Sequence, residues 1–263
     1  MKNREFYIEH DSIPLHAKLD FPQTGSFCAS GEERGERCPL VILLHGYTGH
    51  MEERHILGVS DALTQIGCAV LRVELYGHGK SGGTFREHTL LKWMSEAMAV
   101  IDYARGLEFV TDLYLAGHSQ GGLLAILAGA MKRDALRAVI ALSPATMIPD
   151  GARSGSVLDM TFDPEHVPDV LHTSEGRELS GNYVRAAQMV HVEPAIRAYR
   201  NKVLLVHGDA DDTVPVSRAV DAAAMYEDAQ LEIIHGDTHC YDHHLDQVQD
   251  AIVRFMRPMV GNS

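Results

Sequence analysis

One serine of the sequence stands in a pattern that is typical of catalytic nucleophiles. The stretch Gly117-His118-Ser119-Gln120-Gly121 directly follows an apolar run and precedes a run of small and apolar residues. A serine on a tight turn between a strand and a helix exposes its hydroxyl, and glycine is needed two positions before and after it. The N-terminus of the following helix favours negative charge at the serine. The pattern alone is weak, but this context indicates a nucleophilic Ser119.

A nucleophilic serine needs a general base, and the base needs a carboxylate that orients it. Three candidate acids follow the apolar run 203–206: Asp209, Asp211 and Asp212. Two histidines, His235 and His239, follow the next apolar run. His235 continues that run directly and is expected to be packed. His239 lies in the loop beyond the run and is therefore the expected base.

The elements that must position these residues alternate along the chain. Expected strands cover 6–9, 13–19, 40–44, 68–73, 113–116, 138–142, 203–206 and 231–234. Expected helices cover 53–66, 89–105, 121–132, 216–227 and 243–256. This alternation predicts the α/β class, with a mostly parallel sheet and helices on both faces. The carboxyl edge of such a sheet is where sites form.

One interval breaks the alternation. About fifty residues that include several prolines separate two expected strands, which is too long for a loop without a function. We interpret residues 145–199 as a cap inserted into a single domain that spans residues 1–263. A polar loop is expected at 22–38, away from the site.

Composition limits the function further. The net charge is −13 over 263 residues, so nucleic acid and anionic membranes are poor partners. The chain has neither an apolar run of about 20 residues nor an apolar leader, so we expect neither a membrane span nor a signal peptide. The four cysteines, Cys28, Cys38, Cys68 and Cys240, form no CxxC pair. Reduced thiols and a cytoplasmic location are expected, with a Cys28–Cys38 bridge as the alternative.

Further motifs carry a resemblance to a known family. The stretches His45-Gly46-Tyr47, Gly77–Ser81, Gly117–Gly122 and His207–Pro215 resemble α/β-hydrolase motifs and run in that family's order. More narrowly, the chain resembles bacterial cinnamoyl and feruloyl esterases that have a small inserted cap. The narrower resemblance rests on the Gly-His-Ser-Gln-Gly-Gly motif, on 181–188 and on 236–244.

The resemblance assigns roles to individual residues. It implies that Asp211 is the acid and His239 the base, in the order serine, acid, histidine. The backbone N–H of Gln120, which follows the nucleophile, is expected in the oxyanion hole, and the resemblance adds the N–H of Tyr47. For the cap, it implies that Tyr183 contacts phenolic hydroxyls. Asp150 is a second candidate, although it could equally be a solvated turn residue.

These observations predict a serine carboxylesterase that hydrolyses hydroxycinnamoyl esters, such as feruloyl, caffeoyl and coumaroyl esters. The alternatives are a general short-chain carboxylesterase, a monoacylglycerol-type lipase or a noncatalytic binding protein with this fold. No cofactor is expected, the expected partner is a small aromatic ester, and the resemblance makes a homodimer plausible. One dense group could suggest a metal site: His235, His239, Asp242, His243 and His244. Because neighbouring residues point to different helix faces, no metal is expected there.

Overall fold

A computed structural model describes residues 3–23 and 37–260 of the chain. Within these residues, eight strands form one sheet in the order β1-β2-β4-β3-β5-β6-β11-β12. Their bounds are β1 Asn3–His10, β2 Ile13–Asp20, β3 Cys38–Leu44, β4 Ala69–Val73, β5 Val110–His118, β6 Ala138–Leu142, β11 Lys202–Gly208 and β12 Ala229–Ile234. Only β2 pairs antiparallel, with β1 and β4, and every other pairing is parallel. The predicted α/β class with a mostly parallel sheet is confirmed.

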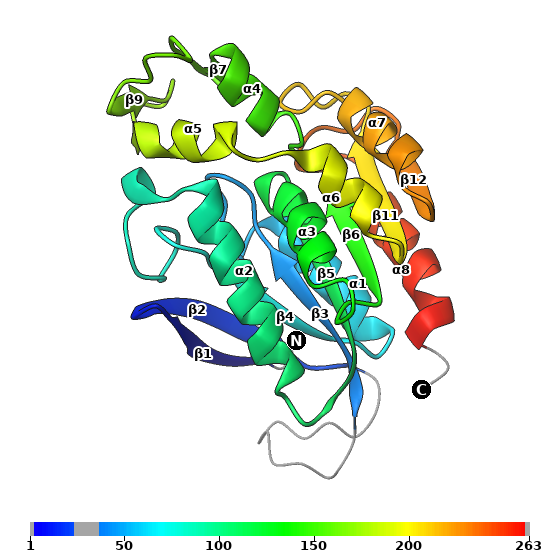
Figure 1. Cartoon of the computed structure of the whole chain (residues 1–263). Coiled ribbons are helices and arrows are strands. Elements are labelled where there is room, and N and C mark those ends of the chain that lie inside the picture. The colour runs from blue at the N-terminus through cyan, green and yellow to red at the C-terminus, as the bar shows by residue number, and fades with distance from the viewer. Residues whose placement is uncertain (1–2, 24–36, 261–263) are drawn as a thin grey trace.

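Helices cover both faces of the sheet (Figure 1). On one face, α1 (Arg54–Gln65) packs against α8 (Leu245–Val260), and their apolar residues share a core with β3, β4 and β11. On the other face lie α2 (Leu90–Arg105) and α3 (Gln120–Met131). The central strands β3, β4 and β6 are buried along their whole length, which explains their continuous apolar sequences.

Residues 145–199, which we call the cap, contribute no strand to the main sheet. Their elements are α4 Ile148–Ser154, β7 Ser156–Val157, β8 Met160–Thr161, β9 Val170–His172, β10 Glu178–Ser180, α5 Gly181–Gln188 and α6 Val192–Ala198. The pairs β7–β8 and β9–β10 form two small hairpins. In Figure 1, α4, α5 and these hairpins lie above α2, α3 and the sheet, while α6 packs on α3.

Several expected boundaries differ from the structure, most clearly those of the last helix, α8. Helix α8 continues to Val260, past the expected end at 256, and Met259 and Val260 pack against the same apolar core. The remaining helix of the body is α7 (Ser217–Met225), and a short 3-10 turn, η1, covers Phe85–Glu87. Cys28 and most of the expected polar loop lie outside the described residues. In the described part, no helix is long and apolar enough to cross a membrane.

Candidate active site

The turn between β5 and α3 holds Ser119 in a backbone conformation that is rare for a residue with a side chain. Its φ is 57° and its ψ is −118°. A Cβ atom on Gly117 would lie 2.1 Å from the carbonyl oxygen of Gly121, and one on Gly121 would lie 2.4 Å from that of His45. Both glycines are therefore required by the close approach of backbone segments, as the sequence pattern predicts.

Backbone hydrogen bonds fix this turn to the neighbouring strand. The N–H of Ser119 donates to the carbonyl of Leu142, 2.8 Å away, at the end of β6. The carbonyl of Ser119 accepts from the N–H groups of Leu123 and Ala145, each at 3.0 Å. The nucleophile candidate is thus held by main-chain contacts to the sheet and to the first residue of the cap.

His239 and Asp211 form a hydrogen-bonded pair at the same edge of the sheet. Nδ1 of His239 lies 2.7 Å from Oδ2 of Asp211, whose side chain is fully buried. Oδ1 of Asp211 accepts from the backbone N–H groups of Thr213 and Val214. Burial alone would raise the pKa of the Asp211 carboxyl, but hydrogen bonds from His207 and His239 hold it well below its ordinary value. The carboxylate is therefore charged and points its lone pairs at the His239 ring.

The two competing carboxylates have other surroundings. Asp209 pairs with His235 at 2.7 Å, and the His235 side chain is 86% exposed. The expectation that His235 is packed is therefore wrong. Strand β12 ends one residue earlier, at Ile234, and the chain turns at Gly236, which leaves His235 beyond the sheet edge. Asp212 is exposed and lines the pocket described next.

A pocket of about 500 Å³ brings Ser119 and His239 together. It lies between the sheet edge and the hairpins of the cap. Its lining comes from the loop after β3, the turn before α3, the cap and the loops after β11 and β12: Gly46, Tyr47, Thr48, Gly49, Glu53, His118, Ser119, Leu158, Asp159, Thr173, Ser174, Glu175, Asp212, Thr213, His239 and Cys240. The size is typical of sites for small organic ligands.

The loop after β3 is shaped to approach the serine. A Cβ on Gly46 would come within 3.1 Å of the Cβ of Ser119, so glycine lets the backbone next to Tyr47 run beside the nucleophile. His45 is fully buried, its Nε2 accepts from the N–H of Leu75, and its Nδ1 donates to the carbonyl of Gly46. Burial lowers the pKa of His45 to about 3. His45 is therefore a neutral side chain with a structural role.

Tyr183 lies next to this pocket but not in its lining. It is fully buried, and its hydroxyl donates to Oε1 of Gln120 at 2.6 Å. Its ring packs against Tyr47 and His88, with ring centroids 5.7 and 5.2 Å apart. The side chain of Gln120, whose N–H is an expected oxyanion donor, is thus held by the cap residue that we expected to meet the substrate.

Asp150 is not brought to the pocket. Its carboxylate is exposed, lies 2.7 Å from Arg153 and 3.8 Å from Arg218, and lines a separate depression beside α6 and α7. The substrate-binding role considered for Asp150 is therefore not supported by the geometry, because two arginines of that depression already neutralise the charge.

Sequence reasoning missed the charge of the pocket. Four carboxylates line it, from Glu53, Asp159, Glu175 and Asp212, and no lysine or arginine of the described residues does. Burial raises the pKa of Glu53. Acids in a polar loop or cap are normally solvated, so no sequence signal distinguished these four.

Comparison with protein families gives a match over residues 35–176, more than half of the chain, to a family described as Serine aminopeptidase, S33. The chain belongs to this α/β-hydrolase family. Comparison with solved structures supports the narrower resemblance to bacterial cinnamoyl and feruloyl esterases. A structure described as ferulic acid bound to Est1E from Butyrivibrio proteoclasticus is 51% identical, with a TM-score of 0.90, over 95% of this chain and 97% of that one.

More distant relatives share a lower sequence identity with this chain. Human palmitoyl-protein thioesterase ABHD10 is 29% identical over 41% of this chain, and the matched part spans 34% of that protein. The Pongo abelii protein of the same name is 23% identical, over 75% of this chain and 65% of its own length. The matches therefore span less than two thirds of these curated relatives. The mouse ABHD10 structure, 16% identical with a TM-score of 0.75 over 97% of this chain and 99% of that one, shows the shared fold.

Together, the family and its close structural neighbour make this protein a serine hydrolase of the esterase type. The geometry suits that chemistry: a serine on a strained turn, a histidine oriented by a buried carboxylate and a helix N-terminus share one pocket.

Proposed function

We propose that the protein is a serine carboxylesterase that hydrolyses hydroxycinnamoyl esters through an acyl-enzyme intermediate. The observation that carries this proposal is the 51% identity, across nearly the whole chain, to an esterase structure described with ferulic acid bound. Ser119 and His239 line one pocket and the buried Asp211 orients His239, which supports the same reaction class.

In the first step, Oγ of Ser119 attacks the ester carbonyl carbon and loses its proton to His239. Because Nδ1 of His239 donates to Asp211, its Nε2 carries the lone pair that accepts this proton. The ionised Asp211 then stabilises the imidazolium that forms. Its low pKa keeps it charged while this happens.

The tetrahedral intermediate carries a negative oxygen, for which we propose the backbone N–H groups of Gln120 and Tyr47 as donors. As the intermediate collapses, the imidazolium of His239 protonates the departing alcohol. Water then attacks the acyl-enzyme with His239 again as base, which releases the acid and restores Ser119.

Aromatic side chains beside the pocket support a phenolic acyl group. The ring of Tyr47 contacts those of Phe85, His88 and Tyr183. The hydroxyl of Tyr47 is buried and has no hydrogen-bond partner among the described residues. A hydroxycinnamate ring that is buried in the pocket needs a hydrogen-bond partner for its phenolic hydroxyl, and the hydroxyl of Tyr47 would supply it. The hydroxyl of Tyr183 would do the same if it gave up its hydrogen bond to Gln120.

The charge of the pocket bears on the alcohol half of the ester. Four carboxylates line the pocket and only Glu175 among them pairs with an arginine, Arg177 at 3.4 Å, so the lining repels an anionic leaving group. We therefore propose that esters with a neutral alcohol, such as methyl or sugar esters, are turned over faster than esters of an acidic alcohol such as quinate. The preference should shrink as added salt screens the carboxylates.

The test is a kinetic panel with methyl ferulate, methyl butyrate and a monoacylglycerol. We expect kcat/KM for methyl ferulate to exceed that for methyl butyrate by at least about tenfold, which corresponds to about 1.4 kcal/mol. Equal values for all three esters would favour a general carboxylesterase, and a preference for the monoacylglycerol would favour a lipase. No turnover of any ester would favour a binding protein.

A further inference from the structure

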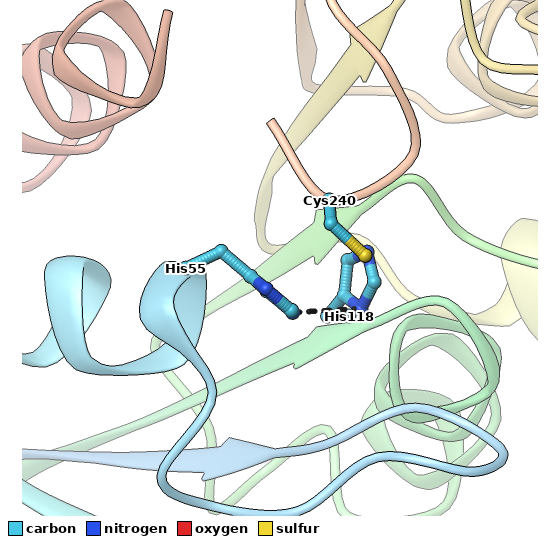
Figure 2. A group of neighbouring side chains, drawn as sticks. All are labelled: His55, His118 and Cys240. Carbon is cyan, nitrogen blue, oxygen red and sulfur yellow. Dashed lines mark hydrogen bonds between the residues drawn. The ribbon is translucent and has the colours of Figure 1, made fainter. Parts of the chain in front are cut away.

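A group of three metal-ligating side chains lies directly behind the proposed catalytic residues. It consists of His55 on α1, His118 at the end of β5 and Cys240 in the loop after β12. The ligand atoms of these side chains, one from each residue, all lie within 4.8 Å of one another. Figure 2 shows the Cys240 sulfur directed toward the His118 ring and the dashed hydrogen bond between the two histidines. No part of the proposed hydrolysis uses His55 or Cys240.

The hydrogen bonds around His118 determine which nitrogen can bind a ligand. Its Nε2 lies 2.8 Å from the carbonyl oxygen of His239, which can only accept, so Nε2 carries the proton. Nδ1 therefore has a free lone pair, and it lies 3.1 Å from Nε2 of His55. A histidine whose other nitrogen donates to a carbonyl is the usual arrangement at metal centres.

We propose that His55, His118 and Cys240 form a binding site for a zinc ion that inhibits the enzyme. Imidazole nitrogen and thiolate sulfur are the ligand atoms that Zn²⁺ most often takes in proteins. Tetrahedral coordination at the usual bond lengths of about 2.0–2.3 Å places ligand atoms roughly 3–4 Å apart, so ligand atoms that lie up to 4.8 Å apart must approach each other by roughly 1–2 Å. The fourth position faces the pocket, where a water or the carboxylate of Glu53, 3.9 Å from Nε2 of His55, completes the shell.

Binding balances with the release of one proton. The thiol of Cys240 loses its proton to solvent as sulfur bonds to zinc. His55 gives up the proton on Nε2 and takes one on Nδ1, so its ring stays neutral. The hydrogen bond between His55 and His118 is replaced by two bonds to the metal.

Zinc at this position would stop hydrolysis for a geometric reason. His118 directly precedes Ser119, and Cys240 directly follows His239. These four residues all line the same pocket, whereas His55 does not. Drawing Cys240 toward His118 moves the backbone of the general base relative to the nucleophile. The ion is an inhibitor and not a cofactor, so a chelator should preserve activity or raise it.

The first experiment uses the metal alone, added to the full-length protein after chelator treatment and dialysis. Co²⁺ serves as a spectroscopic substitute for Zn²⁺. We expect one Co²⁺ per chain, the intense visible bands of a tetrahedral site and a near-ultraviolet thiolate-to-cobalt band, all abolished by one equivalent of Zn²⁺. Absence of the thiolate band would overturn the proposal. This readout needs no substrate and is independent of the proposed esterase activity.

Two variants and one control locate the site. Cys240→Ser should remove the thiolate band, and both Cys240→Ser and His55→Gln should weaken zinc binding at least about tenfold. The control is His243→Gln, because His243 is exposed and beside another histidine but outside the group. Circular dichroism establishes that each variant folds. Zinc affinity that survives both substitutions, or falls only in the control, would place the metal elsewhere.

The inhibition rests on the proposed function and is measured separately. For each variant, the hydrolysis rate in zinc is divided by that variant's own rate in chelator. We expect the zinc concentration for half inhibition to rise at least about tenfold in Cys240→Ser and to stay unchanged in His243→Gln. Binding without inhibition would overturn the inhibitory role, while the spectra would still report the site.

Discussion

The loops at the carboxyl edge of the sheet and the cap hold their polar groups in different ways. At the sheet edge, Ser119 and Asp211 are buried and held by backbone hydrogen bonds that leave one geometry. In the cap, the charged residues pair at the surface, as Arg153 does with Asp150 and Arg185 with Asp169. Exposed pairs contribute about 0–1 kcal/mol each. The sheet edge is therefore built for fixed chemistry, whereas the surface charges of the cap can change at little cost in stability.

The largest effect is expected at the nucleophile. Ser119→Ala should lower kcat by at least about 10³-fold and leave the protein folded, because the methyl group fits the same turn but cannot attack the ester. A matched control is Ser174→Ala, a serine of the cap that lines the same pocket. Steady-state kinetics on purified proteins measure both. Similar losses of kcat in the two variants would contradict the assignment of the chemistry to the sheet edge and not to the cap.

The next effect separates the carboxylates at the sheet edge. Asp211→Asn should lower kcat about 10²–10⁴-fold, since an amide no longer fixes the tautomer of His239 or stabilises its charge. Asp209→Asn should change kcat less than about threefold, because Asp209 holds the exposed His235 and the backbone N–H of Gly236 and, within the described part of the chain, forms no hydrogen bond or ion pair with His239. If Asp209→Asn were the more damaging, Asp209 and His235 would be the acid and the base in place of Asp211 and His239.

The buried histidines of the body predict how stability depends on pH. Burial lowers the pKa values of His45 and His88 to about 3 and of His55 to about 4. The unfolded chain protonates these rings below their ordinary pKa of about 6.5, and the folded chain does not. Stability is therefore complete above pH 6.5 and falls as the pH drops toward 4, by up to about 1.4 kcal/mol per pH unit for each ring.

Denaturant titrations at several pH values check this expectation. The variant His55→Gln removes one such group and should flatten the decline. A cap histidine such as His166, whose side chain is 81% exposed, is the control, and His166→Gln should leave the slope unchanged. A stability that stays level between pH 7 and 5 would show that these rings take up protons without unfolding.

The smallest effect is expected in the cap. Tyr183→Phe should lower kcat/KM only several-fold and equally for ferulate and butyrate esters, because its hydroxyl is bonded to Gln120 and not open to the pocket. Stability should fall by about 1–3 kcal/mol, since Oε1 of Gln120 loses its partner. A loss confined to the ferulate ester would show that the hydroxyl turns toward the substrate, as the family resemblance implies.

Patterns that follow from backbone geometry were predictable from the sequence. The apolar run 138–142 identified a strand that is buried on both faces, and Gly117 and Gly121 identified the turn around Ser119. Such signals are local, because one strand or one close backbone contact determines the residue types. For the same reason, the sequence predicted that the candidate acids and His239 follow neighbouring strands.

Long-range packing was not predictable in the same way. The bond between Tyr183 and Gln120 joins residues 63 positions apart, and His118 meets His55 across a similar separation. His235 looked like the end of a buried strand, but its exposure depends on the turn at Gly236. These placements depend on how the cap and α1 settle on the sheet, for which no sequence pattern exists.

The positive φ of Ser119 has a consequence for the stability of the protein. A side chain in this conformation costs about 1–3 kcal/mol, whereas glycine there costs only about 0.5–1 kcal/mol through the greater freedom of the unfolded chain. Ser119→Gly would therefore raise the free energy of unfolding and remove the nucleophile. A serine at this position therefore costs stability, as strained residues at functional sites commonly do.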